Sequence, residues 1–178
     1  MSEERLIWID CETTGLDPCK DCILEVGCIV TDKNLIEIAR MSEVVSCSVH
    51  LLRRMEDVVA DMHRASGLWD ECLLATRSLD DIAYDLTVFI KKYSVKQSMA
   101  GSTIGFDRAF FYFDAPQVLD ACHYRSVDVS SLKVLAGLWG YPPAVKSREA
   151  KHRALPDIED SIEELRHYRR TMLREVLP

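Results

Sequence analysis

The sequence predicts an α/β fold, in which a mixed β-sheet is flanked by helices within a single domain. Three observations indicate this fold. The chain has 178 residues, which suits one domain with a sizeable core. Its first part contains successive apolar stretches that are rich in β-branched residues. Its later part alternates short stretches of that kind with segments of helical periodicity, a pattern that gives both antiparallel and parallel strand pairs.

Three strands are expected near the N-terminus. The runs that predict them cover residues 6–12, 23–31 and 43–49. Between the first two runs, Gly15 and the dipeptide Asp17-Pro18 are typical of a turn. Side chains alternate between the two faces of a strand, so the acidic residues that end the first run, Asp10 and Glu12, are expected to share one face.

The middle of the chain is expected to contain a helix, a short strand and a second helix. Apolar residues at every third or fourth position predict the first helix at residues 79–90, and Ser78 can cap its start. The short strand is expected at residues 99–101. A loop then leads to the second helix, which carries Asp107 on its first turn.

The last third of the chain is expected to add one strand and two helices. The strand covers residues 124–129, and a helix follows at residues 130–139. Residues 140–151, with two adjacent prolines and several charged side chains, are expected to form a mobile loop. The final helix is expected at residues 156–173, with Pro156 in its first helical position. Its apolar stripe, expected to be buried, consists of Ile158, Ile162, Leu165 and Met172.

Composition limits the classes of function. Hydrophobic residues make up 48% of the chain and charged residues 29%, which is ordinary for a soluble globular protein. No apolar run approaches the ~20 residues that span a bilayer, and the first residues resemble neither a secretory signal nor a transit peptide. We therefore expect a cytoplasmic protein without a membrane partner, or a mitochondrial one only if an N-terminal extension is missing. The net charge of −7 argues against a groove for long nucleic acid, because such proteins usually carry a basic face.

The seven cysteines are expected to be reduced thiols. An odd count without an export signal does not suggest a disulfide framework. Cys19 and Cys22 form a CxxC pair, but no second Cys/His pair with similar spacing accompanies it, as a structural zinc site would require. We expect no function for this pair.

Five residues that are far apart in the sequence could support metal-dependent chemistry. They are Asp10, Glu12, Asp107, His152 and Asp157. Taken singly, each has an ordinary explanation: an Asp-x-Glu pair arises by chance in an acidic chain, a lone aspartate caps a helix, and a loop histidine is usually solvated. Two carboxylates at the end of a buried strand, however, repel each other and lose hydration, and a divalent cation between them relieves both costs.

The types of these residues indicate the metal and the reaction. Four carboxylates without a His/Cys cluster favour Mg²⁺ or Mn²⁺ over zinc. Two such ions ~4 Å apart can hold the attacking and leaving oxygens of a phosphodiester in line. A neighbouring imidazole, such as that of His152, can then take the proton from the attacking water.

The order of these residues resembles that of the DEDDh exonucleases of the RNase H-like superfamily: Asp-x-Glu, then Gly-x-x-x-Gly-x-Asp, then His-x-Ala-x-x-Asp. More narrowly, the chain resembles the oligoribonuclease family of 3′-to-5′ exonucleases over nearly its full length. The matching segments are residues 6–18, 63–68, 101–108, 123–133 and 152–161. The His-Tyr-Arg block at residues 123–125, with the Asp-Val-Ser that follows it, is the most particular to this family. The resemblance implies a five-stranded RNase H-like sheet.

The resemblance also implies roles in catalysis. The four carboxylates Asp10, Glu12, Asp107 and Asp157 would bind two Mg²⁺ or Mn²⁺ ions in each active site, and His152 would be the general base. The implied activity is the hydrolysis of short single-stranded RNA, dinucleotides especially, to 5′-mononucleotides.

Six further positions are implied to contact the substrate. They are Leu16, His63, Thr103, Tyr124, Arg125 and Ser130. Leu16 would wedge against the bases. Thr103, Arg125 and Ser130 would bind the 5′ phosphate, which explains how an acidic protein could favour dinucleotides. The implied assembly is a homodimer in which Tyr124 and Arg125 reach the partner's site.

The chain departs from the family pattern in three places. Val58 stands where members usually carry a tryptophan, the segment between the second and third motifs is shortened, and Ser102-Thr103 belongs to a motif in which asparagine and glutamine are more usual. Rate and length preference are therefore left open. Two alternatives also remain: a DEDDh exonuclease that acts on DNA or on longer RNA, and a non-catalytic dinucleotide-binding module. The second is disfavoured because all five catalytic positions are present.

Overall fold

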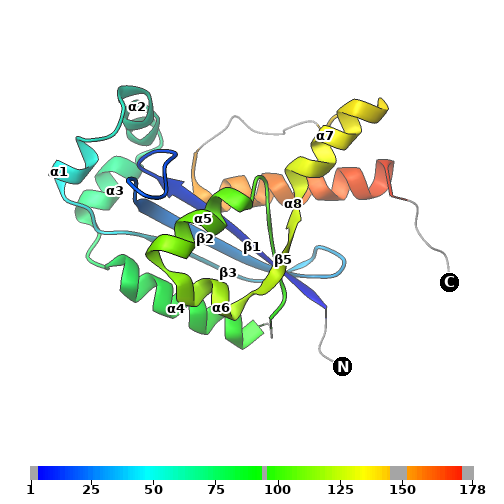
Figure 1. Cartoon of the computed structure of the whole chain (residues 1–178), viewed down its shortest axis with the longest axis horizontal. Helices are drawn as coiled ribbons and strands as arrows, with labels where there is room; N and C mark the ends of the chain where they lie inside the picture. The colour runs from blue at the N-terminus through cyan, green and yellow to red at the C-terminus, as the bar shows by residue number, and fades with distance from the viewer. Residues whose placement is uncertain (1–3, 94–95, 145–151, 174–178) are drawn as a thin grey trace.

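The structure is a computed structural model that describes residues 4–93, 96–144 and 152–173 (Figure 1). At its centre is a five-stranded sheet with the strand order β3-β2-β1-β4-β5. The strands are β1 (Arg5–Thr13), β2 (Ile23–Asp32), β3 (Glu37–Val44), β4 (Ser98–Gly101) and β5 (His123–Asp128). β1, β2 and β3 pair antiparallel, whereas β4 pairs parallel with both β1 and β5. The predicted mixed, five-stranded sheet is confirmed.

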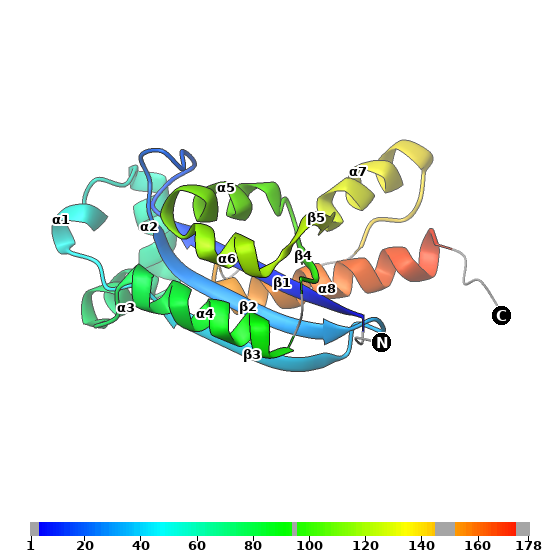
Figure 2. The same cartoon turned by 60° about the horizontal axis from the view of Figure 1, so that its bottom comes forward.

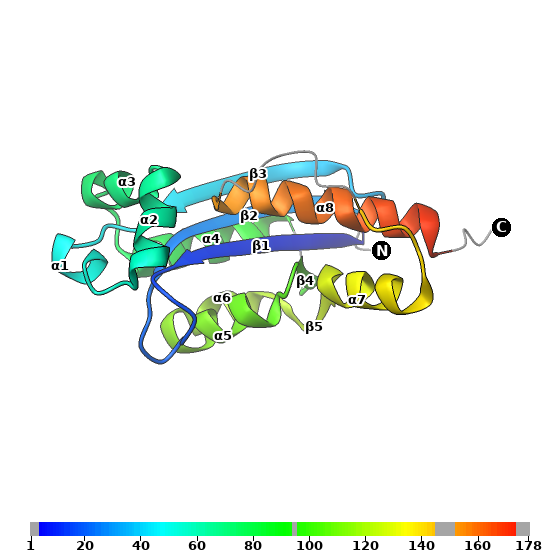
Figure 3. The ribbon, with the colours of Figure 1, turned by 90° about the horizontal axis from the view of Figure 1, so that it is seen from above.

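The helices lie on both faces of this sheet and at one of its ends. They are α1 (Val49–Leu52), α2 (Asp57–Ala65), α3 (Leu68–Leu74), α4 (Leu79–Tyr93), α5 (Gly105–Asp114), α6 (Pro116–Ala121), α7 (Val129–Trp139) and α8 (Ala154–Thr171). α8 contacts β1 and β2 on one face, and α4 and α5 contact the same two strands from the other (Figure 2). α1, α2 and α3 lie at the end of the sheet where β1 terminates (Figure 3). No helix in the described residues is long and apolar enough to cross a membrane.

Alternation along β1 divides the core into two clusters. Ile7, Ile9 and Cys11 belong to the cluster that includes buried residues of α4, α5 and α6. Trp8, between Ile7 and Ile9, belongs to the cluster formed with α7 and α8. β2 is buried along almost its whole length, as expected for a strand covered on both faces. The even-numbered residues of β1 therefore face α8.

Gly27 allows α8 to approach the sheet closely. A Cβ atom at Gly27 would lie 2.8 Å from Cβ of Ala154 and 3.1 Å from Cδ1 of Ile158. Gly27 pairs with Asp10 in the β1–β2 register. The first turn of α8 thus rests on the backbone of β2 beside Asp10, and any larger residue at this position would push it away.

Several predicted boundaries need correction. The third strand covers Glu37–Val44 rather than residues 43–49. The Val45 N–H still donates to the Leu24 carbonyl of β2, but the next amide, that of Ser46, donates to Arg77 outside the sheet. The three helices between residues 49 and 74 were not predicted. α8 begins at Ala154, so Pro156 lies within its first turn rather than at the first position.

Other expectations for the later part of the chain were met more closely. Ser78 accepts a hydrogen bond from the Asp81 N–H, as expected for the cap of α4. The predicted stripe of α8 is largely buried, with Tyr168 added and Met172 only partly covered. The expected mobility of the 140–151 loop concerns residues that lie mostly outside the described part of the chain.

Candidate active site

Two acidic side chains project from the C-terminal half of β1 toward α8. Cys11, between them, packs into the opposite core cluster, so the predicted shared face of Asp10 and Glu12 is confirmed. Glu12 is only 8% exposed. A buried strand thus delivers two carboxylates to the place where the N-terminus of α8 meets the sheet.

Helix α8 adds a third carboxylate. Asp157 lies in its first turn, where the helix dipole favours a negative charge. One oxygen from each of Asp10, Glu12 and Asp157 lies within 4.8 Å of the other two. Tertiary packing therefore unites residues from opposite ends of the sequence in one acidic group.

Asp107 lies beside this group but is held differently. It is 3% exposed on the first turn of α5. Its Oδ1 accepts a hydrogen bond of 2.8 Å from the backbone N–H of Cys11. It is not part of the 4.8 Å group, although its charge raises the pKa of Asp10 more than any other charge does. Of the four predicted carboxylates, the structure brings three into one tight group and places Asp107 beside it.

Burial and mutual repulsion raise the pKa of these carboxyl groups. Burial raises the pKa of Glu12 to about 8, and the charges of Asp157 and Glu25 contribute. Burial raises the pKa of Asp107 to about 7, although hydrogen bonds to it oppose the shift. The pKa of Asp10 is raised well above its ordinary value, by burial first and by neighbouring carboxylates second. Without a cation, the cluster therefore retains protons near neutral pH.

The donor set fits a hard divalent cation. All the clustered ligand atoms are carboxylate oxygens, and the nearest cysteine, Cys11, faces the opposite side of the sheet. Carboxylates are the ligands that Mg²⁺ and Mn²⁺ prefer, whereas zinc sites usually include histidine or cysteine. Asp10, Glu12 and Asp157 could hold such an ion directly, with Asp107 beside them.

His152 lies at the entrance to α8, two residues before the helix begins. It is exposed, and its backbone has φ +48°, in the left-handed region that few non-glycine residues adopt. Burial lowers the pKa of His63, and the charge of His152 lowers it further, which places the two rings in the same neighbourhood. An exposed imidazole thus lies near His63 and two residues before the helix that carries Asp157.

Comparisons with known proteins identify the family. An exonuclease family model matches residues 7–165. A probable oligoribonuclease of Schizosaccharomyces pombe is 36% identical over 94% of this chain and 68% of its own length. The oligoribonucleases of Cutibacterium acnes and Xylella fastidiosa are 38% and 39% identical over 94% and 96% of this chain, and over 86% and 91% of their own lengths.

The chain belongs to the oligoribonuclease family of exonucleases.

Solved structures support the fold. E. coli exonuclease I in complex with single-stranded DNA superposes with a TM-score of 0.69 at 12% identity, covering 94% of this chain and 41% of its own. Exonuclease I of Methylocaldum szegediense gives a TM-score of 0.67 at 20% identity, covering 94% and 40%. This chain therefore spans about two fifths of those larger proteins, with which it shares the exonuclease fold.

Leu16 occupies an exposed loop that is internally fixed. Its side chain is 82% exposed. Asp21 holds the loop by accepting hydrogen bonds from Thr14 Oγ1 and the Asp17 N–H, each at 3.0 Å. Gly15 makes room for this arrangement, because a Cβ there would lie 2.5 Å from an Asp21 oxygen. The loop of this family member thus presents one apolar side chain on a rigid support.

Two of the residues expected to bind phosphate meet at Asp128. Oδ1 of this side chain accepts hydrogen bonds from the Thr103 N–H at 3.0 Å and from the Ser130 N–H at 2.9 Å and Oγ at 2.6 Å. Thr103 has φ +58°, and Ser130 lies in the first turn of α7. Asp128 was not predicted as a site residue. It brings together two hydroxyl-bearing residues at the C-terminal ends of β4 and β5.

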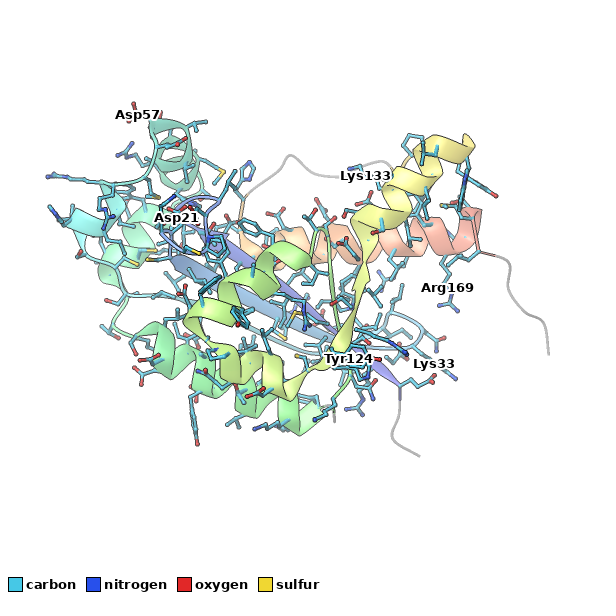
Figure 4. The ribbon with its side chains drawn as sticks, viewed as in Figure 1. Asp21, Lys33, Asp57, Tyr124, Lys133 and Arg169 are labelled. Atoms are coloured by element: carbon cyan, nitrogen blue, oxygen red, sulfur yellow. The ribbon has the colours of Figure 1, made fainter. Side chains whose placement is uncertain are left out.

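Tyr124 and Arg125 lie away from the carboxylates of their own chain. Both are exposed near the start of β5, where Figure 4 labels Tyr124. The Arg125 guanidinium lies 5.3 Å from the Tyr124 ring centre. The strand register places Tyr124 three to four residues back along the sheet from Asp10 and two strands across, roughly 15 Å away. Within one chain they do not join the site.

His63, the sixth expected substrate residue, is fully buried. Its Nε2 lies 2.9 Å from the carbonyl oxygen of Thr13, at the end of β1, and its Nδ1 has no hydrogen-bond partner among the described residues. This ring therefore supports the strand end that carries Glu12.

Sequence reasoning missed two charged residues behind the carboxylate group. Glu25 is 3% exposed and pairs with Glu12 in the β1–β2 register. Arg153 forms an ion pair with Glu25 at 2.9 Å. The signal for Glu25 was present, because an acidic residue within an apolar strand needs a buried partner. Nothing in the local sequence could have named Arg153 as that partner.

Proposed function

We propose that this member of the oligoribonuclease family is a 3′-to-5′ exoribonuclease that hydrolyses short oligoribonucleotides, dinucleotides especially, to 5′-mononucleotides. The observation that carries the proposal is the group of three carboxylates from β1 and α8, with Asp107 beside it and His152 two residues before the helix that carries Asp157. The oligoribonucleases that match nearly all of this chain support the same activity.

The carboxylates would hold two Mg²⁺ or Mn²⁺ ions. Asp10, Glu12 and Asp157 would be direct ligands, and Asp107 would complete the set. When bound, the ions would supply Lewis-acid activation and charge stabilisation for phosphodiester hydrolysis. The raised pKa of Glu12 supports a cation partner, because a carboxylate that is costly to ionise alone is stabilised by positive charge.

The remaining groups would bind and orient the RNA and deprotonate the attacking water. His152 would accept a proton from the attacking water, a role that suits an imidazole near neutral pH. The exposed Leu16 would pack against a base. Thr103 and Ser130, which Asp128 gathers, would bind the 5′ phosphate once the Ser130 hydroxyl exchanges its hydrogen bond to Asp128 for one to the phosphate. Affinity would then come from one terminal phosphate, which an acidic protein can bind without a long basic groove.

Assembly as a homodimer would supply the residues that a single chain holds too far from its site. Tyr124 is 71% exposed on β5, an edge strand. α7, which follows, exposes Val134, Leu138 and Trp139 at 61%, 73% and 63%. Exposed apolar side chains on neighbouring elements of this kind would suit an association surface. A two-fold partner that packs on β5 and α7 would carry its own Tyr124 and Arg125 toward the first site.

The seven free cysteines fit a reducing compartment, and we expect the protein in the cytoplasm.

The activity is tested with end-labelled RNAs of two to ten nucleotides, incubated with Mn²⁺, with Mg²⁺ or with chelator. We expect 5′-mononucleotides only with metal, fastest turnover of the dinucleotide, and much weaker binding of a dinucleotide that lacks the 5′ phosphate. A rate that rises steadily with length, or equal cleavage of DNA, would indicate an exonuclease with an open groove. Tight dinucleotide binding without product at any metal concentration would indicate a binding module.

Assembly is tested by mixing two inactive variants. His152→Ala and Tyr124→Ala proteins, combined and exchanged, should recover part of the activity, because one hybrid site would contain an intact copy of each residue. A protein that sediments as a fully active monomer at micromolar concentration would contradict the dimer.

A further inference from the structure

We propose that Arg153 is a positioning residue: its guanidinium joins Glu25 on β2 to Glu71 on α3 and thereby sets where His152 and Asp157 stand relative to the carboxylates of β1. We call these three side chains the Arg153 clamp. The inference rests on the proposed exonuclease activity, because the residues it positions are the expected base and a metal ligand.

The clamp is a pair of two-point ion pairs that share one arginine. Arg153 Nε donates to Glu25 Oε2 at 2.9 Å, and its NH2 donates to Glu25 Oε1 at 3.2 Å. On its other edge, NH1 donates to Glu71 Oε1 at 2.9 Å and NH2 to Oε2 at 2.7 Å. Two-point contacts of this kind fix orientation as well as distance, and a lysine cannot reproduce them.

Glu25 ties the clamp directly to the start of α8. Its Oε2 also accepts a hydrogen bond from the backbone N–H of Ala154 at 3.2 Å, one of the amides that a helix N-terminus leaves without an internal partner. Ser42 Oγ donates to Oε1 at 3.1 Å. Glu25 thus anchors both the side chain of Arg153 and the first helical amide that follows it.

The clamp lies between the two residues it is proposed to place. His152 immediately precedes Arg153 and has a left-handed backbone, a conformation that persists only where neighbouring contacts impose it. Arg153 is the N-cap of α8 and has no side-chain cap of its own, and Asp157 lies one turn further on. Fixing the Arg153 side chain to two other elements therefore limits rotation of His152 on one side and sliding of the helix on the other.

Proximity to the carboxylates strengthens the assignment. Glu25 stands opposite Glu12 in the register, and paired residues of antiparallel strands project from the same face. Arg153 forms its ion pair with Glu25 on that same face of the sheet. Arg153 therefore lies directly behind the metal-ligand group, so a loosened α8 would move Asp157 relative to the other ligands.

The chain provides a matched control for the experiment. Arg40 on β3 also joins two carboxylates, with hydrogen bonds of 2.7 Å from Nε to Glu37 Oε1 and 2.9 Å from NH1 to Glu159 Oε1. Glu159 belongs to α8 as well, so Arg40 links the sheet to the same helix. It does so at an exposed position, and the carboxylates that it joins lie outside the acidic group.

The test compares Arg153→Ala, Arg153→Lys, Glu71→Gln and Arg40→Ala at saturating Mn²⁺, with kcat and KM measured on a 5′-phosphorylated dinucleotide. A misplacement of about 1 Å costs on the order of 100-fold in rate, so we expect kcat to fall by roughly that factor in Arg153→Ala with KM within threefold. Arg153→Lys should recover only part of kcat, and Glu71→Gln should lose less than Arg153→Ala. Arg40→Ala should keep the wild-type kcat.

A second readout needs no substrate. Amide hydrogen exchange across residues 152–158 should accelerate in Arg153→Ala and, more weakly, in Glu71→Gln, and should stay unchanged in Arg40→Ala. Wild-type kcat together with wild-type exchange in Arg153→Ala would overturn the clamp while leaving the nuclease activity intact. If Arg153→Ala exchanges faster but the wild-type protein cleaves no RNA, the clamp would be upheld and the proposed function overturned. Equal losses of kcat in Arg153→Ala and Arg40→Ala would reduce Arg153 to a general helix anchor and overturn the proposal.

Discussion

Replacing Gly27 with alanine should reduce activity far more than stability. The new Cβ would lie 2.8 Å from Cβ of Ala154 and 3.0 Å from its carbonyl carbon. Carbon atoms prefer separations of about 3.5–4.0 Å, so the first turn of α8 must retreat by roughly 1 Å. Overpacking of this kind costs about 1–3 kcal/mol of folding free energy. The same retreat carries Asp157 away from Asp10 and Glu12, and a shift of that size costs on the order of 100-fold in turnover.

The measurement is kcat on a dinucleotide across a Mn²⁺ titration, well below the melting temperature of the variant. We expect a lower kcat and a higher Mn²⁺ midpoint, because the three ligand oxygens no longer meet within the same group. Gly137→Ala is the control for the added methyl group, since no described atom beyond its chain neighbours and its own helix backbone lies within 4 Å. Because Gly137 lies on α7, sedimentation should check that this change leaves the proposed dimer intact. Wild-type kcat and Mn²⁺ midpoint in a folded Gly27→Ala protein would refute the idea that the close approach of α8 sets the site.

Three further outcomes are expected. Asp157→Asn should lower turnover by roughly 100- to 1,000-fold at saturating Mg²⁺ while a melting curve shows a folded protein, since it removes charge stabilisation and not packing. The metal-free protein should lose stability as pH rises from 5 to 8.5, because the folded state keeps protons on Glu12 and Asp107 that the unfolded chain has already released. Their pKa values are raised to about 8 and about 7 in the folded state. Saturating Mn²⁺ should abolish this trend, and denaturant melts at each pH would check it. Leu16→Ala should leave the melting temperature unchanged yet weaken dinucleotide affinity in Ca²⁺, because this side chain is 82% exposed in a loop that Asp21 holds; equal affinity would exclude it as a base contact.

The sequence predicted those parts of the fold whose patterns are local. The apolar run of β1 and its two-residue alternation correctly placed Asp10 and Glu12 on one face. β3 was placed too late because it is an edge strand with a largely exposed face, so its own residues are not markedly apolar, whereas the valines that follow it are. The short helices α1 and α3 were missed because four and seven residues give too few turns for a periodic signal.

The order of the motifs was enough to predict which residues form the site, but not how closely they are grouped. Motifs identified the carboxylates, but the 4.8 Å grouping depends on Gly27, whose importance appears only when α8 is seen against β2. Arg153 and Glu25 are 128 positions apart, and no local pattern pairs them. The same limit applies to Asp128, whose carboxylate serves Thr103 from 25 positions away.

The acidic group takes two of its members from the first strand and the third from the last helix, and this has a consequence for biosynthesis. While the chain is being made, β1, β2 and β3 can pair early because they are adjacent in sequence, whereas Asp157 arrives only when α8 has been synthesised and has docked. An incomplete chain therefore carries the binding surface of the early strands without a complete metal site. The proposed hydrolase activity would therefore begin only after α8 has been synthesised and has docked on the sheet.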